Sequence, residues 1–311
     1  MLKKCVYLYS QKLMPMSKPH FAGVFKSLLY STSALFPTPL YLKMLFRVMM
    51  GERLDLENPR TINEKIQWLK IHDRNAAYTS LVDKVTAKDH VLEVTGDESL
   101  IIKTLGVWKH FRDIDFDSLP DSFVLKANNS GGSKGIAICG DKSSFNRAAA
   151  GRKLERALKR NLFWRYREWP YKDISPAILA EEYIGKADSD FSEVKLVCLN
   201  GKVKYAFICL GRHSGKGTTY DFYDRDWNLL PFTQVKEHNS GKPVPRPVHF
   251  DRMIEVAEQL SSGMRMLRVD FYDTPQRLMF GEMTFYDGSG FELYHPGEWD
   301  GIIGSWLDLG T

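Results

Sequence analysis

The chain has 311 residues, of which 43% are hydrophobic, 26% charged and 13% aromatic. This composition is that of an ordinary folded protein, and it excludes a disordered tail, a collagen-like fibre and a small disulfide-stapled scaffold. The length predicts about two domains of roughly 150 residues each. The four cysteines form no C-x-x-C pair, so the sequence predicts neither a zinc site nor a disulfide framework, and we expect a reducing, cytoplasmic compartment.

The basic charge of the chain is concentrated at its N-terminus. Residues 1–51 hold seven Lys and Arg residues and no Asp or Glu, which leaves 36 basic against 38 acidic residues in the rest of the chain. A nucleic-acid-binding protein is expected to carry its basic residues across its folded face. We therefore predict no nucleic-acid partner.

This basic N-terminal arm has two interpretations. Its longest uncharged stretch, residues 27–42, contains Pro37 and Pro39 and falls short of the ~20 apolar residues that span a membrane. Lys12 and Lys18 interrupt what would be the apolar run of a signal peptide. A basic segment rich in aromatic and aliphatic residues can lie on an anionic membrane surface, so one hypothesis is peripheral contact of residues 1–51 with the inner face of the membrane. The alternative is that the arm packs its aromatic side chains against the main domain.

Two helices are expected after the arm. Thr61 is placed to cap the first, over residues 61–72, because Glu64 follows three residues later and completes a capping box. Asp83 is expected to cap the second, which would run to about Val94.

Hairpins dominate the sequence after residue 121. Strand-like runs at 123–127 and 136–139 flank a Gly-rich turn, and a helix over about 148–162 and a strand at 178–184 follow. Asn200-Gly201 is a strong two-residue hairpin turn between runs 194–199 and 203–210. A helix at about 250–263 precedes a last hairpin, 268–272 and 277–285. Hairpins mixed with single helices predict an α+β fold.

The Gly-rich turn is the first candidate for chemistry. Backbone N–H groups of such a turn can surround phosphate oxygens, and Lys126 on the entering strand would add a positive charge. Neither a Walker loop nor the dinucleotide fingerprint fits the spacing. The residues expected to contact phosphate are Ser130, Gly131, Gly132 and Gly135. An ordinary flexible turn is the alternative.

The strand end Glu181-Glu182-Tyr183-Ile184 is the second candidate. A carboxylate or backbone carbonyl there can accept the amino group of adenine while apolar side chains hold the ring. Two solvated glutamates at a strand end would be the simpler explanation.

Asp270 and Glu282 in the last hairpin are the third candidate. The expected register places them face to face, where two like charges are unfavourable unless a cation lies between them. Oxygen ligands favour Mg²⁺, and Arg268 on the same face would meet a transferring phosphoryl group. Alternatively, the two carboxylates pair with Arg268 and Arg277.

The loop Asp287-Gly288-Ser289-Gly290 is the fourth candidate. Its backbone donors would hold a substrate carboxylate or an acyl phosphate, and the alternative is a plain turn.

The order of these signals resembles that of an ATP-grasp enzyme, and more narrowly the TupA-like ATP-grasp family, named for a teichuronopeptide biosynthesis protein. The resemblance covers roughly residues 55–309. The matching stretches are 58–68 (NPRTINEKIQW), 83–84 (DK), 119–126 (LPDSFVLK), 180–183 (AEEY), 194–195 (VK), 200–202 (NGK), 268–272 (RVDFY) and 281–286 (GEMTFY).

The resemblance implies an ATP-grasp fold, in which two α+β subdomains grip the nucleotide, here with a helical basic N-terminal arm. The expected parts are the arm at 1–56, a helical part at 57–118, a small subdomain with the Gly-rich loop at 119–184 and a C-terminal subdomain with the Mg²⁺ site at 185–311. It implies a carboxylate–amine ligase that forms an amide through an acyl phosphate and uses ATP and Mg²⁺. The family association is with capsule and O-antigen polysaccharides, so the expected substrate is a small molecule or a lipid-linked glycan carrying a uronic acid.

Carried over by motif, Lys126 and Lys84 would bind phosphates, and Glu181 with the backbone of Tyr183 and Ile184 would hold adenine. Glu193 would lie near the ribose, Lys195 would reach the triphosphate, and Arg268 would stabilise the pentavalent phosphorus. Asp270 and Glu282 would hold Mg²⁺. Thr284 stands where the family usually has a metal-binding Asn, and Glu193 stands one residue further from Lys195 than the usual Asp.

Two other functions share the same nucleotide site. A kinase that phosphorylates a sugar hydroxyl would need a general base, for which Asp287, His213 and His295 are candidates. A nucleotide-binding partner of polysaccharide enzymes would need no turnover.

Overall fold

The computed structural model of the chain describes residues 19–185, 192–211, 218–236 and 238–310. Within them, helices combine with three sheets whose strand pairs are all antiparallel, which confirms the predicted α+β class. The single-turn and shortest elements are η1 (Ser33–Leu35), η2 (Glu98–Leu100), η3 (Phe111–Asp113), η4 (Gly132–Gly135), α8 (Leu162–Tyr166), η5 (Trp169–Tyr171), η6 (Asp287–Gly290), β8 (Thr233–Gln234) and β11 (Tyr294–His295).

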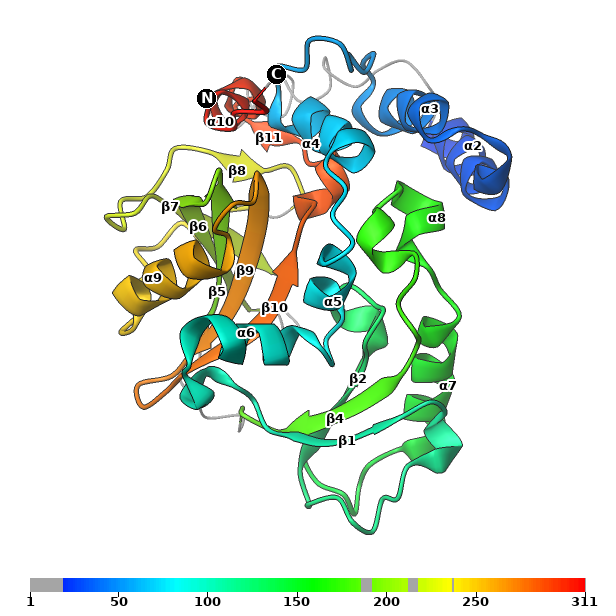
Figure 1. Cartoon of the computed structure of the whole chain (residues 1–311), viewed down its shortest axis with the longest axis vertical. Coiled ribbons are helices and arrows are strands. Elements are labelled where there is room, and N and C mark those ends of the chain that lie inside the picture. The colour runs from blue at the N-terminus through cyan, green and yellow to red at the C-terminus, as the bar shows by residue number, and fades with distance from the viewer. Residues whose placement is uncertain (1–18, 186–191, 212–217, 237, 311) are drawn as a thin grey trace, which may run out of the picture.

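A four-stranded sheet carries the Gly-rich loop. Its strands lie in the order β1 (Thr104–Trp108), β4 (Ile178–Glu182), β2 (Phe123–Ala127) and β3 (Ile136–Cys139). The predicted hairpin is β2–β3, with Lys126 opposite Ile136. Helix α7 (Arg147–Leu158) covers one face through Leu154, which shares a buried cluster with Phe123 and Leu125 (Figure 1). Since side chains alternate along a strand, Val124 and Lys126 face the other side.

A five-stranded sheet forms the larger half of the molecule. Its order is β10 (Leu278–Thr284), β9 (Met266–Asp273), β5 (Ser192–Leu199), β6 (Lys202–Leu210) and β7 (Thr219–Tyr223). Asn200 and Gly201 form the turn of β5–β6 with φ of 51° and 73°, which confirms the predicted hairpin.

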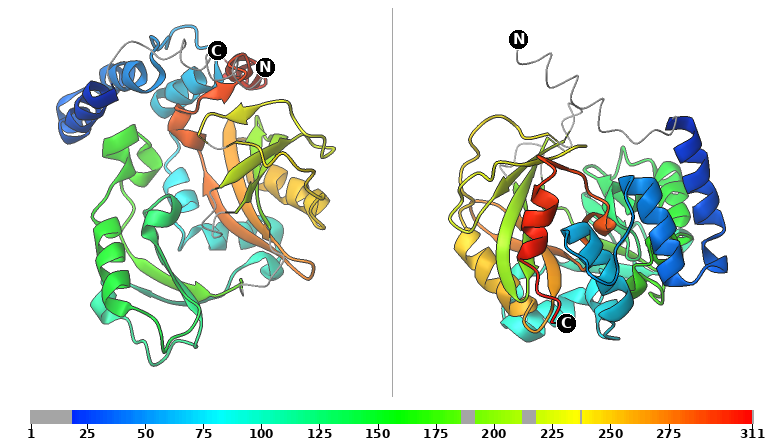
Figure 2. Two further views of the ribbon diagram at one scale, coloured as in Figure 1. Left: turned by 180° about the vertical axis from the view of Figure 1, so that it is seen from behind. Right: turned by 90° about the horizontal axis from the view of Figure 1, so that it is seen from above.

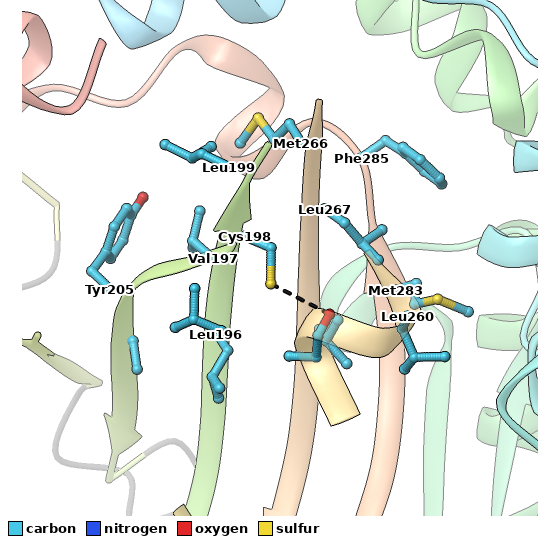
Figure 3. Packing of buried hydrophobic residues seen from close by; sticks show 14 of the residues in the cluster. Leu196, Val197, Cys198, Leu199, Tyr205, Leu260, Met266, Leu267, Met283 and Phe285 are labelled. Carbon is cyan, nitrogen blue, oxygen red and sulfur yellow. Dashed lines mark hydrogen bonds between the residues drawn. The ribbon is translucent and has the colours of Figure 1, made fainter. Parts of the chain in front are cut away.

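Helix α9 (Phe250–Leu260) packs on the core face of this sheet. Figure 3 shows Leu196, Cys198 and Leu267 in this apolar layer, and Cys198 Sγ donates to the carbonyl oxygen of Ala257 at 3.6 Å. Helix α9 thereby leaves the opposite face of β5, β9 and β10 for other contacts.

The helices between the arm and the first sheet partly follow the prediction. Helix α4 (Ile62–His72) begins with the expected capping box, in which Thr61 accepts from the Glu64 amide. The second predicted helix is wrong at its start, because Asp83 ends α5 (Tyr78–Val82) and a separate α6 runs over Ala87–Thr95. The Asp83 carboxylate instead accepts from the amide of Val85 and from Asn128 Nδ2. The Asp83 carboxylate therefore binds Asn128, just after β2, and does not cap a helix that begins at residue 83.

The described part of the arm packs on the main body. Helices α2 (Pro19–Ser31) and α3 (Thr38–Met50) form a helical hairpin at one edge of the molecule, near α8 (Figure 2). Tyr41, Leu45 and Phe46 of α3 are buried in a cluster with Phe291. Arg167 donates to the carbonyl oxygens of Ser33 and Phe36. The packing that the second interpretation expects is therefore present in this part of the arm, while its exposed residues leave the membrane contact of the first interpretation open to test. Residues 1–18 lie outside the described ones.

At the other end of the described chain, α10 (Trp299–Ser305) packs on α4. Among the described residues, no helix combines the length and apolar character needed to cross a membrane.

Candidate active site

Three neighbouring strands set charged side chains in one row. Lys195 of β5 lies opposite Asp270 of β9, and Asp270 lies opposite Glu282 of β10, as predicted for the last hairpin. The register shifts at Gly281, where a Cβ atom would come 3.0 Å from the Asp270 carbonyl oxygen. Glycine at this position therefore lets the two strands approach closely while Glu282 keeps its place in the row.

Arg268 binds this row together. Its Nε and Nη2 donate to the two carboxylate oxygens of Asp270 at 2.6 and 2.9 Å, and Nη1 donates to Asp287 Oδ1 at 2.6 Å. Nη2 also lies 3.3 Å from Glu282 Oε1 and 3.2 Å from Thr284 Oγ1. A guanidinium held bidentately by one carboxylate is fixed in orientation. The alternative interpretation, in which Arg268 pairs with both carboxylates, is confirmed for this residue.

In that alternative interpretation Arg277 shares the role of Arg268, but the structure does not show this. Arg277 Nη1 lies 3.1 Å from Glu182 Oε1, and its Nε and Nη2 donate to the carbonyl oxygens of Ser99 and Ile101 at 2.8 and 2.6 Å. Arg277 points across to β4 and η2 because it lies beyond the end of the paired row. It thereby fastens the hairpin of β9–β10 to the smaller sheet.

Two lysines complete the row. Lys195 Nζ contacts Asp270 and lies 2.7 Å from Glu193 Oε1. Lys84, from the turn between α5 and α6, lies 3.2 Å from Glu282 Oε2 and donates to the Ser130 carbonyl oxygen at 2.8 Å. Lys84 therefore joins the Gly-rich loop to strand β10.

A second group of charges lies on the smaller sheet. Glu181 is buried at the end of β4 between Lys126, at 2.5 Å, and Lys88 of α6. Lys88 also donates to the Ile102 carbonyl oxygen and to Thr104 Oγ1 at 2.7 and 2.9 Å. Sequence reasoning missed Lys88, although a lysine on the same helix face as the apolar residues Ala87 and Val91 was a signal that could have identified it.

The ionic contacts shift several pKa values. Burial disfavours the charged form of Glu181, but the Lys126 and Lys88 ammonium groups outweigh it and lower the pKa of Glu181. Burial is likewise outweighed at Glu282, where Lys84 and Lys195 hold the pKa far below its usual range. At Arg268, Asp270 and Asp287 overcome burial and hold the pKa well above its usual range. These side chains are therefore charged at neutral pH.

A cavity of about 1000 Å³ opens beside this second group, between β3, the end of β4 and β9. Of the predicted site residues, those that line it are Lys126, Glu181, Tyr183, Ile184 and Glu193. Its apolar walls include Ile102, Val124, Ile136 and Ile138, with Tyr272 on the side of the larger sheet. A cavity of this size with apolar walls and a few charged groups is typical of a small-molecule site.

The remaining predicted residues do not line this cavity. Among them, Ser130, Gly131, Gly132 and Gly135 belong to the loop, where Gly132 has a φ of 64°. Ser130 is tied to the row through Lys84. The loop therefore neighbours the row through Lys84, and the row neighbours the cavity through Glu193, which lines the cavity and contacts Lys195.

Side chains of α4 hold the loop of η6 through hydrogen bonds to its backbone. Gln67 Nε2 donates to the carbonyl oxygens of Ser289 and Gly290, and Lys70 Nζ donates to that of Ser289 at 2.7 Å. Ser289 Oγ contacts Glu168, and the Asp287 carboxylate accepts from Arg268. Gly288, Ser289 and Gly290 all have positive φ, between 54° and 65°. The predicted substrate loop is therefore held in an unusual conformation by α4 and by the segment before η5.

Sequence reasoning missed Gln67, Lys70 and Glu168. Gln67 and Lys70 share the buried face of α4 with Ile66, and that mixture of polar and apolar residues was the available signal. Burial lowers the pKa of Lys70 to about 7 despite the attraction of Glu168, and burial raises the pKa of Glu168.

Two of the candidate general bases for a kinase, Asp287 and His295, lie on different elements. His295 is exposed on the β8–β11 ribbon, and Asp287 already accepts from Arg268. His213 lies outside the described residues.

Oxygen atoms suited to Mg²⁺ converge in the row. Carboxylate and hydroxyl oxygens of Asp270, Glu282 and Thr284 all lie within 3.3 Å of Arg268 Nη2. Carboxylate and hydroxyl oxygens are the hard donors that Mg²⁺ prefers. Here all three accept from Arg268, and the described residues contain no group of three or more His, Cys, Asp or Glu side chains placed to hold a metal ion. These residues therefore fit the metal in the type of donor they offer, with Arg268 as the cation among them.

The family model described as TupA-like ATPgrasp matches residues 64–308. The chain belongs to the TupA-like ATP-grasp family. The predicted family is thereby confirmed, and with it the predicted ATP-grasp fold.

Solved structures similar to this TupA-like chain include a RimK-domain ATP-grasp protein from Sphaerobacter thermophilus, at 14% identity over 76% of this chain and 70% of that one, with a TM-score of 0.40. A D-alanine–D-alanine ligase from Helicobacter pylori has 15% identity over 79% and 69%, with a TM-score of 0.41. The corresponding ligase from Bacillus anthracis, complexed with ATP, has 14% identity over 66% and 53%, with a TM-score of 0.37. No curated protein matches the chain in sequence.

Proposed function

We propose that this protein is an ATP-dependent carboxylate–amine ligase that forms an amide through an acyl phosphate. The observation that carries the proposal is the juxtaposition of an apolar-walled cavity with a row of buried cations, of which Arg268 already binds three carboxylates. Groups arranged to hold carboxylate oxygens can also hold phosphoryl and acyl-phosphate oxygens, because both present pairs of anionic oxygens that a guanidinium fork can bind bidentately.

The nucleotide would occupy the cavity. Adenine would lie against the apolar walls, with the backbone of Tyr183 and Ile184 as its hydrogen-bonding edge and Glu193 near the ribose. Lys126 would bind phosphate oxygens at the inner end. Glu181 is held by two lysines, so its proposed part is to orient Lys126 as well as to border the adenine.

The phosphates beyond the cavity would meet the row and the Gly-rich loop. Lys84 reaches both, because it contacts Glu282 and the Ser130 carbonyl. The N–H groups of Gly131, Gly132 and Gly135 are proposed to approach the terminal phosphate. Asp270, Glu282 and Thr284 would hold Mg²⁺, which when bound supplies charge neutralisation for the triphosphate.

The reaction has two displacements. A carboxylate oxygen attacks the γ-phosphorus, the bond to the β–γ bridging oxygen breaks, and ADP leaves with the electron pair. An amine then attacks the acyl carbon, phosphate leaves, and the nitrogen loses a proton to give the amide. Arg268 would neutralise charge that develops on the transferring phosphoryl group, with Lys195 beside it. The Asp287–Gly290 loop would hold the acyl group near that centre.

The proposed substrates are a uronic acid and an amine or amino acid in the synthesis of a cell-surface polysaccharide, such as capsule or O-antigen. This proposal is supported by family membership, and the acceptor is proposed to be a small molecule or a lipid-linked glycan.

Hydroxylamine trapping tests the ligase chemistry. The protein would be incubated with ATP, Mg²⁺, hydroxylamine and a panel of uronic and amino acids, and hydroxamate and ADP would be measured. Hydroxamate that depends on one carboxylate, and that is lost in Lys126→Met but kept in the exposed control Lys109→Met, is the expected result. ADP with a stable phosphorylated product and no hydroxamate would establish the kinase instead. ATP binding with no ADP formed in the presence of any substrate would favour the non-catalytic partner.

We also propose that the α2–α3 hairpin makes peripheral contact with an anionic membrane. Leu28, Leu35 and Leu40 are 55%, 77% and 49% exposed there, and Lys26 and Lys43 lie on the same two helices. Exposed leucines beside lysines and no acidic residue suit an anionic lipid surface.

Deletion of residues 1–51 would remove the buried core residues of α3, so substitution is the better test. Flotation with phosphatidylglycerol vesicles is expected to fall in Leu35→Ser/Leu40→Ser and to persist in Leu229→Ser/Val248→Ser, two exposed apolar residues elsewhere. Equal flotation of both variants, or equal binding to uncharged vesicles, would refute the membrane proposal.

A further inference from the structure

A second concave surface lies on the outer side of the smaller sheet, at α7. Its volume is about 410 Å³, and its lining consists of Lys134, Ala149, Arg152, Lys153, Arg156 and Arg160. Five of these six residues are cationic, and we call this surface the basic pocket.

The five cations have no counter-charge in the part of the chain that the structure describes. None of their side chains takes part in an ion pair or a hydrogen bond with another described residue, and all five are exposed. Glu155, the acidic residue of α7, turns away and accepts from the Phe111 amide at 2.8 Å. The buried row of the active site pairs its cations with carboxylates, so the basic pocket is electrostatically different from it.

The spacing of these cations favours an elongated ligand. Arg152, Arg156 and Arg160 follow one another at four-residue intervals along α7 and just beyond its end. Arg152 and Arg156 share one side of α7, ~6 Å apart along its axis, and Arg160 follows the end of the helix. Like charges at this spacing destabilise a helix. A single small anion would neutralise only part of the set, whereas a chain with several anionic groups would meet all of it.

The basic pocket adjoins the cavity proposed to hold the nucleotide. Ala149 and Lys153 line both, and Lys134 follows Ser133, which lines the cavity. A chain in the basic pocket would therefore have one end beside the Gly-rich loop.

We propose that the basic pocket binds an extended oligosaccharide that carries several carboxylates, and that this chain is the acidic substrate whose end reaches the active site. The second half of this statement rests on the proposed ligase function, whereas binding itself does not. Arginine forks suit carboxylates. The lining has no aromatic ring on which a nucleic-acid base could stack, and such stacking is the usual contribution to single-strand binding.

Binding of a fluorescently labelled oligogalacturonate to the full chain tests the proposal. We expect the unaltered protein to bind the oligogalacturonate in 0.15 M salt. The triple variant Arg152→Gln/Arg156→Gln/Arg160→Gln is expected to bind it at least tenfold more weakly. The matched control, Arg53→Gln/Arg74→Gln/Arg112→Gln, removes the same charge from exposed arginines on other elements and is expected to bind as the unaltered protein does. A circular dichroism spectrum and an unfolding midpoint like those of the control would show that the test variant is folded.

Two probes distinguish the ligand class. An uncharged oligosaccharide should not bind, whereas polyphosphate and single-stranded DNA should bind more weakly than the oligogalacturonate. Equal binding of the two triple variants overturns the site, and tighter binding of DNA or polyphosphate overturns its assignment to an acidic glycan. ATP binding and hydroxamate formation are measured separately, so oligogalacturonate binding without hydroxamate would count against the ligase and leave the basic pocket in place.

Discussion

Replacement of Arg268 by methionine tests the electrostatic account of the site most directly. The buried guanidinium is the shared partner of three carboxylates, of which Asp287 has no other ionic or hydrogen-bonding partner among the described residues. Asp270 would retain Lys195, and Glu282 would retain Lys84. The substitution therefore leaves one buried carboxylate without any counter-charge.

Loss of one member of a buried ion pair costs about 3–5 kcal/mol of the free energy of unfolding. The cost arises because the buried Asp287 carboxylate keeps no counter-charge in the variant. We therefore expect Arg268→Met to lose stability of about this size at pH 7.

Urea unfolding followed by circular dichroism at pH 7 measures this effect. The double variant Arg268→Met/Asp287→Asn should recover part of the loss, because it removes the unpaired charge. Arg246→Met is the control: it breaks the exposed pair with Asp251, which is 84% exposed and whose loss should cost under about 1 kcal/mol. A loss of less than about 1 kcal/mol in Arg268→Met at pH 7, or no recovery in the double variant, would refute the reasoning.

Three further predictions follow from single residues. Glu282→Gln should lower the rate of ADP release about 100-fold at saturating ATP and Mg²⁺, which corresponds to about 2.7 kcal/mol, and an unchanged rate would remove Glu282 from the metal site. Lys70→Met should flatten the pH dependence of the free energy of unfolding. The pKa of Lys70 is about 7 in the folded state and near 10.5 in the unfolded state, so the unaltered protein should gain up to ~1.4 kcal/mol of stability per pH unit between these values. Parallel stability–pH curves for the variant and the unaltered protein would contradict this. Thr61→Ala should cost about 1 kcal/mol in urea unfolding through loss of the capping box, and restoration by Ser would confirm the cause.

The features that short-range geometry determines were predictable from the sequence. The capping box at Thr61, the Asn200-Gly201 turn and the register that opposes Asp270 and Glu282 each depend on neighbours in the chain or on the period of a strand. The order of the motifs also predicted the family, because each motif has a fixed place along an ATP-grasp chain.

The partners of individual charged groups were not predictable in the same way. Lys70 contacts Ser289 across 219 residues of sequence, and Arg277 reaches Ile101 across 176. No local pattern encodes such pairs, because they arise when separate elements pack. The same cause explains the break between α5 and α6, where Asp83 is engaged by Asn128, 45 residues away.

The charges of the site lead to one last prediction. Within the described residues, the two groups joined by ion pairs around the cavity and the row contain five cations, Lys84, Lys88, Lys126, Lys195 and Arg268, and five carboxylates, Glu181, Glu193, Asp270, Glu282 and Asp287. This set is neutral as it stands, so a triphosphate would bring uncompensated negative charge into a buried region, which is costly.

A divalent cation that enters with the nucleotide would offset that charge, and it would do so without breaking the ion pairs of Glu181 on the smaller sheet. We therefore expect a non-hydrolysable ATP analogue to bind at least tenfold more tightly with Mg²⁺ than with EDTA. In Glu282→Gln/Asp270→Asn, where two carboxylates are neutral, the dependence on Mg²⁺ should shrink, because the site then carries excess positive charge of its own. Equal affinity of the unaltered protein in Mg²⁺ and EDTA would contradict this charge balance, even if the analogue bound tightly in both.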